Sequence, residues 1–274
     1  TYANVGKTKN FGYDLTFNFV PVRTKDFEWN IGVNAAYSRN EIVSLANGKE
    51  DDPANGWFIG ESTNSIYTYE SAGLWKEEDR ADMEKFNANG HDFQIGMARP
   101  VDQNGDYKID ANNDRTIVGH YDPRWTLGLN TNFTYKGWDL GIQLYGRMGF
   151  KYYDSSVWVG GRYNVRDYDY YNENNKNAAH PKPIYDEGGK DAYYNETYLK
   201  NGSYLKIRNI SLGYTFPNRL LTHTGLSALR MYAQIKNPGY IFSGCKTLDL
   251  DTYSNTYNSG FTFGLNLSLS LIHI

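Results

Sequence analysis

The residues best suited to bind an ion lie in one short segment, 102–110, where carboxylate or amide side chains occupy four of the five alternate positions. The spacing matches the first, third, fifth, seventh and ninth positions of an EF-hand-type loop. The residues are Asp102, Asn104, Asp106, Asp110 and, through its carbonyl, Lys108. This pattern predicts calcium as a candidate cofactor. Because Tyr107 replaces the turn glycine and Asn113 stands where a bidentate Glu is expected, a water-solvated Asx-rich loop is the alternative.

A second group of functional candidates is aromatic. The segment from about 150 to 203 carries tyrosines among Asn, Asp and Gly, a combination that suits sugar rings, peptides or a docking interface, because Tyr buries area while keeping a hydroxyl. Packing of these loops on one another is the alternative. The residues predicted to contact a ligand or partner are Tyr152, Tyr153, Trp158, Tyr163, Tyr168 and Tyr170.

Signals for other functional classes are weak. The five histidines are scattered, and neither an H-E-x-x-H pair nor a G-x-S-x-G elbow occurs, so we predict that the chain is not an enzyme. The net charge is -3 without a Lys/Arg run, which argues against nucleic acid as a partner. The single cysteine, Cys245, precludes an internal disulfide framework and is expected to be a small packed residue.

The elements that must position these residues are strands. Apolar and polar residues alternate one by one in several runs, and the clearest begins at Phe11. The chain is rich in Tyr, Phe, Trp and Gly, which favours an all-β fold. The predicted strands are 10–20, 27–37, 125–135, 138–148, 205–216, 228–236 and 261–271. A change of phase predicts a bulge near Arg208 and Asn209.

The gaps between these strands alternate between short and long. In an antiparallel meander this order puts every short turn at one end of the sheet and every long loop at the other, as in outer-membrane barrels. Strands of about 11 residues at ~3.3 Å each, tilted by ~40°, fit the ~25 Å apolar band of such barrels. We therefore predict an antiparallel up-and-down transmembrane β-barrel portion with long extracellular loops. A soluble β-sandwich, whose strands also alternate, is the alternative.

The two faces of the predicted strands differ in charge. The faces that begin at Phe11, Phe27, Trp125, Trp138 and Phe261 carry no charged side chain, as a lipid-facing surface requires. The opposite face is polar and is expected to face water. It bears Asp14, Asn18, Asn30, Asn34, Asn130, Asn132, Gln143 and Arg147.

Several segments resemble, in order, the C-terminal part of SusC/RagA-type TonB-dependent outer-membrane transporters of Bacteroidetes. The first is Asp102–Asp110 followed by Asn113–Gly119. The others are Pro123-Arg124-Trp125 with Gly128-Leu129-Asn130, Tyr135-Lys136-Gly137-Trp138-Asp139-Leu140, Ser203–Tyr214 and Leu229–Gln234. The resemblance covers nearly the whole chain, and the joint occurrence of these segments is far more specific than any one of them.

This resemblance implies that residues 1–274 form the last third of a plugged barrel of about 22 strands, with the plug domain absent. It implies import of a bulky nutrient, an oligosaccharide above all, across the bacterial outer membrane. Expected partners are a SusD-like surface lipoprotein as a lid, TonB acting through the missing plug, a glycan or peptide substrate, and outer-membrane lipid. A soluble carbohydrate-binding β-sandwich and a passive porin-like barrel are the alternative functions.

Overall fold

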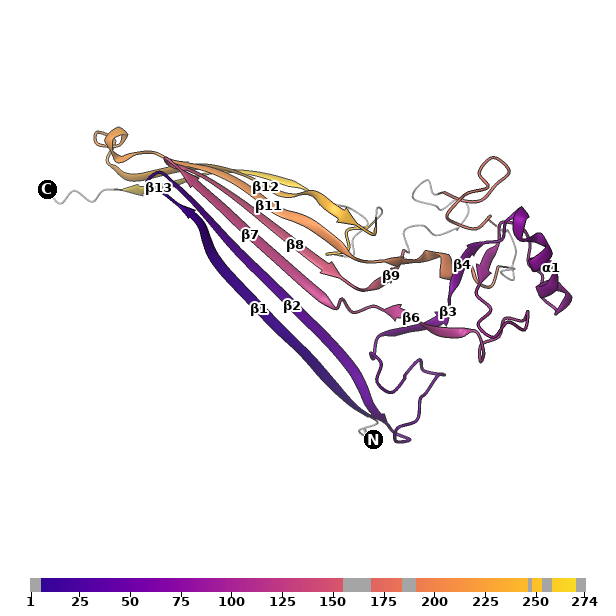
Figure 1. Cartoon of the computed structure of the whole chain (residues 1–274). Helices are drawn as coiled ribbons and strands as arrows, with labels where there is room; N and C mark the ends of the chain where they lie inside the picture. Colours follow the sequence, from indigo (N-terminus) through magenta and orange to yellow (C-terminus); the bar gives the residue numbers. More distant parts are fainter. Residues whose placement is uncertain (1–5, 155–168, 184–190, 246–247, 253–257, 270–274) are drawn as a thin grey trace.

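A computed structural model describes residues 6–154, 169–183, 191–245, 248–252 and 258–269. Its main feature is a seven-stranded antiparallel sheet with the strand order β1-β2-β7-β8-β11-β12-β13 (Figure 1). The strands are β1 (Gly6–Arg23), β2 (Phe27–Leu45), β7 (Trp125–Tyr135), β8 (Trp138–Met148), β11 (Tyr204–Thr215), β12 (Leu226–Ser243) and β13 (Gly260–Leu269). All seven predicted strands are present, and β1, β2 and β12 are longer than the alternation indicated.

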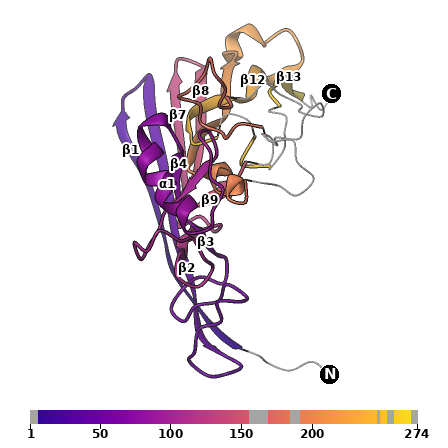
Figure 2. The same cartoon turned by 90° about the vertical axis from the view of Figure 1, so that its right-hand side faces the viewer.

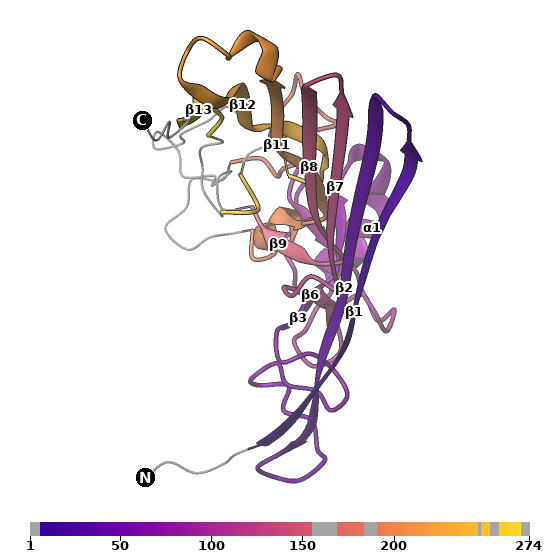
Figure 3. The same cartoon turned by 90° about the vertical axis from the view of Figure 1, so that its left-hand side faces the viewer.

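The short turns and the long loops lie at opposite ends of the sheet, as their alternation in the sequence predicts. The three short connections lie at one end of the sheet, and the long ones lie at the other (Figures 1 and 3). The tightest connection is Lys136-Gly137, where both residues have positive φ values of 45° and 89°. Such a two-residue turn matches the twist of the strands that it joins, and Gly137 approaches the Thr215 carbonyl too closely for a side chain.

The register keeps the apolar residues of neighbouring strands in common rows. Tyr13 lies opposite Tyr37, which in turn lies opposite Trp125, and the rings of Tyr13 and Tyr37 stack at 5.3 Å between centroids. The apolar face of the sheet stays open along the described strands: Leu15 is 45% exposed and Phe263 is 82% exposed. This openness disfavours the β-sandwich alternative, in which a second sheet would bury that face.

The predicted bulge is confirmed. Strand β11 shifts its register between Ile207 and Asn209 against both of its neighbours, β8 and β12. Against β8, Arg208 is the extra residue, whereas on β12 two residues, Asn237 and Pro238, lie across from it. Because a bulge restores the phase of the alternation, Leu205 and Ile207 share the apolar face with Ile210 and Leu212.

The sequence analysis missed a small module in the long gap between β2 and β7. Its elements are β3 (Ser65–Tyr69), β4 (Ser71–Leu74), the 3-10 helix η1 (Glu77–Asp79), α1 (Arg80–Ala88), β5 (Ala98–Pro100) and β6 (Arg115–His120). They lie beyond the long-loop end of the sheet (Figures 1 and 2). The module has its own core of Trp75, Met83, Phe86, Phe93, Met97 and Ile109.

Shorter elements complete the described part of the chain. They are β9 (Lys151–Tyr153), which pairs with β10 (Leu199–Asn201), and the 3-10 helices η4 (Tyr194–Tyr198) and η5 (Asn218–Leu220). No helix among the described residues has the length and apolar character needed to span a membrane.

Candidate functional site

The predicted calcium segment follows α1 and β5 in the loop module. Asp102 accepts hydrogen bonds from the backbone N–H groups of Gly105 (2.7 Å) and Tyr107 (2.8 Å), so its carboxylate closes a tight turn. Tyr107 has a φ of 60°, the left-handed conformation that glycine supplies at the sixth position of an EF-hand-type loop. The backbone thus adopts the expected turn although the glycine is replaced.

The ends of this segment are joined by Asp114, a residue that the sequence analysis did not consider. Its side chain is fully buried, and its carboxylate accepts the N–H groups of Gln103 (2.9 Å) and Asp110 (2.7 Å). A hydrogen bond from the Asn113 side chain, with others from the backbone of Asn112 and Asn113, lowers the pKa of Asp110. An acidic residue one place beyond Asn113 is the signal that could have identified Asp114.

A metal centre of several clustered acidic, His or Cys side chains is not formed in the described residues, where no three of these types converge on one point. Calcium at Asp102, Asn104, Asp106, Lys108 and Asp110 therefore remains a prediction. It would depend on amide and carbonyl oxygens as well as carboxylates. The module holds the segment in place, because the Ile109 N–H donates to His91 Nε2 at 3.0 Å and Lys85 Nζ donates to the Tyr107 hydroxyl at 3.2 Å.

The structure separates the predicted aromatic contact residues. Tyr152 is buried in a cluster with Phe150, Tyr204, Cys245 and Leu250, so its ring serves packing. Tyr153, its neighbour on β9, is partly exposed, and its ring centroid lies 6.4 Å from that of Tyr121. Tyr170 is exposed. The remaining three, Trp158, Tyr163 and Tyr168, lie outside the described residues.

Tyr153 also contacts a carboxylate that the sequence analysis missed. Glu196 on η4 accepts hydrogen bonds from the Thr68 hydroxyl at 2.8 Å and the Tyr153 hydroxyl at 3.3 Å. Burial raises the pKa of Glu196, and burial together with the nearby Glu196 charge raises the pKa of Tyr153. Glu196 thereby joins β3 of the module to β9. Together with Tyr121, these groups offer an aromatic and hydroxyl-rich surface for a polar ligand.

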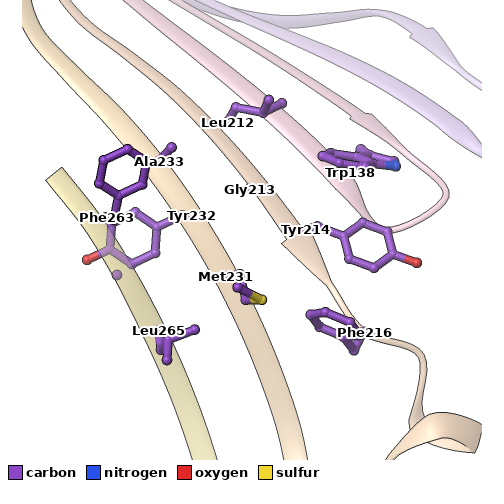
Figure 4. A pocket seen from close by; sticks show the side chains of 11 residues that line it. Trp138, Leu212, Gly213, Tyr214, Phe216, Met231, Tyr232, Ala233, Phe263 and Leu265 are labelled. Carbon is purple, nitrogen blue, oxygen red and sulfur yellow. The ribbon is translucent and has the colours of Figure 1, made fainter. Parts of the chain in front are cut away.

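The apolar face carries a hollow of about 770 Å³ near its short-turn end. Its walls come from β8, β11, β12 and β13 (Figure 4). Trp138 and Tyr214 lie beside the turns, and Leu212, Met231 and Phe263 line the interior. These side chains form part of the face that the sequence analysis assigned to lipid.

The opposite face is polar and presents ion pairs and amides. Asn18, Asn130 and Gln143 lie in one row across the strands, with Gly32 between the first two, and Asn34 lies in a neighbouring row. The apolar rows carry no charged side chain from Tyr13 to Phe19, whereas Lys9, Arg39 and Glu41 follow in the same phase toward the long-loop end. The fold therefore defines a two-faced antiparallel wall with long loops at one end, which is the arrangement of an outer-membrane barrel portion.

Comparison of the sequence with known proteins finds similarity to TonB-dependent receptors. No family model matches the chain. The chain is 27% identical to TonB-dependent receptor SusC of Bacteroides thetaiotaomicron, a match that covers 97% of this chain and 27% of that protein. It is 26% identical to TonB-dependent receptor P3 of Formosa agariphila, with 85% of this chain and 24% of that protein covered. The chain thus spans about a quarter of the length of these curated relatives.

Solved structures agree on the fold. The chain superimposes on a structure of the RagAB peptide transporter with a TM-score of 0.70 and 24% identity, covering 97% of this chain and 30% of that chain. It also matches the RagAB peptide importer in the open-open state, with a TM-score of 0.71 and 23% identity over 98% of this chain and 29% of that chain. The comparisons confirm the resemblance to SusC-type TonB-dependent receptors, the barrel-portion fold and the bacterial outer-membrane location.

Proposed function

We propose that this chain forms the C-terminal wall of an energy-coupled outer-membrane importer that moves a bulky nutrient, an oligosaccharide. The observation that carries the proposal is the two-faced sheet. Its apolar side chains are exposed on one face, while the other face offers amides and hydroxyls along which a hydrated substrate can move without a deep binding minimum. The similar proteins are receptors and transporters, which supports a conformational rather than a catalytic role.

The proposed partners follow from the same similarity. A SusD-like surface lipoprotein would cover the long-loop end as a lid, and TonB would deliver energy through a plug domain. The long-loop end supports a lid contact, because Trp57 before the module and Tyr121 directly after it are exposed. The surface around Tyr153 and, separately, the exposed Tyr170 are the proposed contacts for substrate or lid.

Peptides are the second candidate substrate class. The similar solved structures are described as a peptide transporter, and the hydroxyls of Tyr153 and Thr68 beside Glu196 could serve a peptide as well as a sugar. Oligosaccharide remains our first choice because the exposed tyrosines offer flat faces for sugar rings.

The decisive experiment is uptake by a strain in which the gene is deleted and then restored. Labelled oligosaccharides and labelled peptides are supplied in parallel, with and without an uncoupler of the inner-membrane proton gradient. Restored uptake that the uncoupler abolishes supports the proposal, and the substrate that is taken up decides its class. Uptake that persists without energy would indicate a passive porin-like barrel instead.

A loop variant tests the contact surface. Tyr153→Ala and Tyr170→Ala should lower uptake several-fold, whereas Tyr135→Ala, an exposed tyrosine at the short-turn end, should leave uptake unchanged. Equal uptake by all three variants would contradict the proposed contact. Recovery of the protein in the soluble fraction without detergent would contradict the membrane location and favour the soluble sugar-binding alternative.

A further inference from the structure

A lysine is buried on the polar face of the sheet beneath a short segment of the β12–β13 connection. Lys206 on β11 is 1% exposed, and its Nζ lies 2.7 Å from an Asp251 oxygen and 3.6 Å from an Asp249 oxygen. A charged side chain at this depth requires compensating charge, because desolvation disfavours an isolated ion. The two carboxylates of residues 248–252, which we call the strap, supply that charge.

The strap lies on the face that would line the lumen. Lys206 alternates with Leu205 and Ile207 of the apolar face, and its partner across the ladder is Tyr145 of the polar face. Tyr204, two residues earlier, packs with Leu250 of the strap and with Cys245, and all three are buried. The strap therefore lies against the inner wall.

Additional polar contacts fix both carboxylates of the strap. Asp249 accepts a hydrogen bond from the Tyr240 hydroxyl of β12 at 2.5 Å. Asp251 accepts hydrogen bonds from Arg208 at 3.1 and 3.2 Å and from the Tyr204 hydroxyl at 3.2 Å. Two cations thus balance two anions across β11 and the strap. Arg208 is itself held flat on the wall, with its guanidinium carbon 3.6 Å from the Tyr145 ring centroid.

One side chain, Lys206, contacts both carboxylates that hold the strap in place. Lys206 is the group that both carboxylates share, and it is shielded from water, whereas Arg208 pairs with Asp251 but not with Asp249 and is far more exposed. Loss of the Lys206 charge would leave the buried Asp249 and the largely covered Asp251 with too little compensating charge. The carboxylates would regain hydration only if the strap left the wall.

We propose that the strap is latched to the inner wall by Lys206, and that the latched strap fills space along the wall which a bulky solute can enter once the latch opens. The inference concerns the space inside the proposed importer and so rests on the proposed barrel. Its test does not depend on import, because Cys245 reports on the strap directly. Its thiol is buried and lies next to the strap in the same cluster.

The experiment measures modification of Cys245 in whole cells that carry the complete protein in the outer membrane. A small membrane-impermeant maleimide and a polymer-linked maleimide are used, and the Cys245 peptide is quantified by mass spectrometry. Both reagents should react slowly with the wild-type protein. In Lys206→Met, both should react about tenfold faster or more, because labelling of a buried group follows the population of the open state.

Lys236→Met is the matched control. Lys236 is an exposed lysine on the adjacent strand β12, facing Asn209 across the ladder, and forms no ion pair among the described residues. Its substitution should leave both rates within twofold of wild type. Rates in Lys206→Met that equal the wild-type rates would overturn the latch. Faster reaction of the small reagent alone would overturn the claim that the strap occupies space needed by a bulky solute.

Asp251→Asn keeps the proposal testable if Lys206→Met does not reach the membrane. This variant retains the contact between Lys206 and Asp249 while removing the shorter of the two pairs. Its rates should lie between those of the wild type and those expected for full release. A wild-type rate in folded Asp251→Asn would contradict the latch. Absence of nutrient uptake by the wild-type protein would count against the proposed function and leave the labelling result unaffected.

Discussion

Arg230 on β12 reaches across β11 to Asp139 on β8, and the two side chains meet over Gly213. The Arg230 Nε lies 3.0 Å from Asp139 Oδ1, and its Nη2 lies 2.5 Å from Oδ2, so the pair is bidentate. Gly213 lies opposite Asp139 on one side and Tyr232 on the other. Because Gly213 has no side chain, the ion pair has room to form above it. The ion pair ties three strands together on the polar face.

Gly213→Ala is therefore expected to destabilise the sheet. The added Cβ would overlap the guanidinium of Arg230 and the carboxylate of Asp139, which must then separate or shift. Overpacking of this kind typically costs about 1–3 kcal/mol. The measurement is thermal unfolding of the detergent-extracted protein, followed by its heat-dependent mobility on gels. Gly239→Ala on β12 is the control, because a Cβ there meets no atom within 4 Å; an equal loss in both variants would contradict this account.

The assignment of the apolar face to lipid predicts an asymmetry between adjacent residues of β1. Leu15→Arg places a charge on the apolar face and should cost about 2–4 kcal/mol if the residue lies near the bilayer midplane. Asp14→Arg introduces the same side chain one residue earlier, on the polar face, and should cost much less. Folding yield in bilayers or detergent measures both. Equal yields would show that hydrocarbon does not cover the apolar face.

Glu196 makes the stability of the loop module dependent on pH. Burial raises the pKa of this carboxyl above its ordinary value of 4.5, so the folded state binds the proton more tightly than the unfolded state. At pH values between the ordinary pKa and the raised one, the folded state holds more protons than the unfolded state. The free energy of unfolding therefore falls as pH rises across that window. The penalty remains at higher pH.

Glu196→Gln is expected to remove this dependence and to leave the module at least as stable at neutral pH, since the amide can still contact Thr68 and Tyr153. Hydrogen exchange of the peptide that contains η4, measured at several pH values, checks this. Glu50→Gln, at an exposed carboxylate, should keep the wild-type profile. A Glu196→Gln profile that still falls with rising pH would exclude Glu196 as the cause.

The long strands were predictable because a period of two is repeated over many residues. β7 and β8 have the predicted bounds, and even the bulge at Arg208 was visible as a change of phase. The loop module was not predictable in this way. Its strands span three to six residues and α1 spans nine, which is too short for a period to emerge, and its core assembles around Trp75 from distant residues.

The site residues that were missed depend on contacts far apart in the sequence. Glu196 is paired with Thr68, 128 residues away, and no local pattern marks such a pair. Lys206 resembles an ordinary polar residue of an alternating strand, and its burial arises only because the strap folds onto it. Asp114 was closer to prediction, since it lies one place beyond the loop length that the calcium pattern assumes.

The calcium prediction can be tested on the complete protein by calorimetry with calcium as the titrant. If Asp102, Asp106 and their neighbours bind the ion, heat should be released or absorbed on addition, and saturation at 100 times the Kd should stabilise the module by about 2.7 kcal/mol. Asp102→Asn with Asp106→Asn should abolish the signal, because both carboxylates supply early ligand positions. Glu78→Gln, an exposed carboxylate of η1 outside the segment, should bind like the wild type. A wild-type titration without heat and without a change in unfolding temperature would favour an Asx-rich turn without an ion. Asp102 and Asp114 can hold such a turn alone, because they already accept hydrogen bonds from the backbone of Gly105, Tyr107 and Gln103.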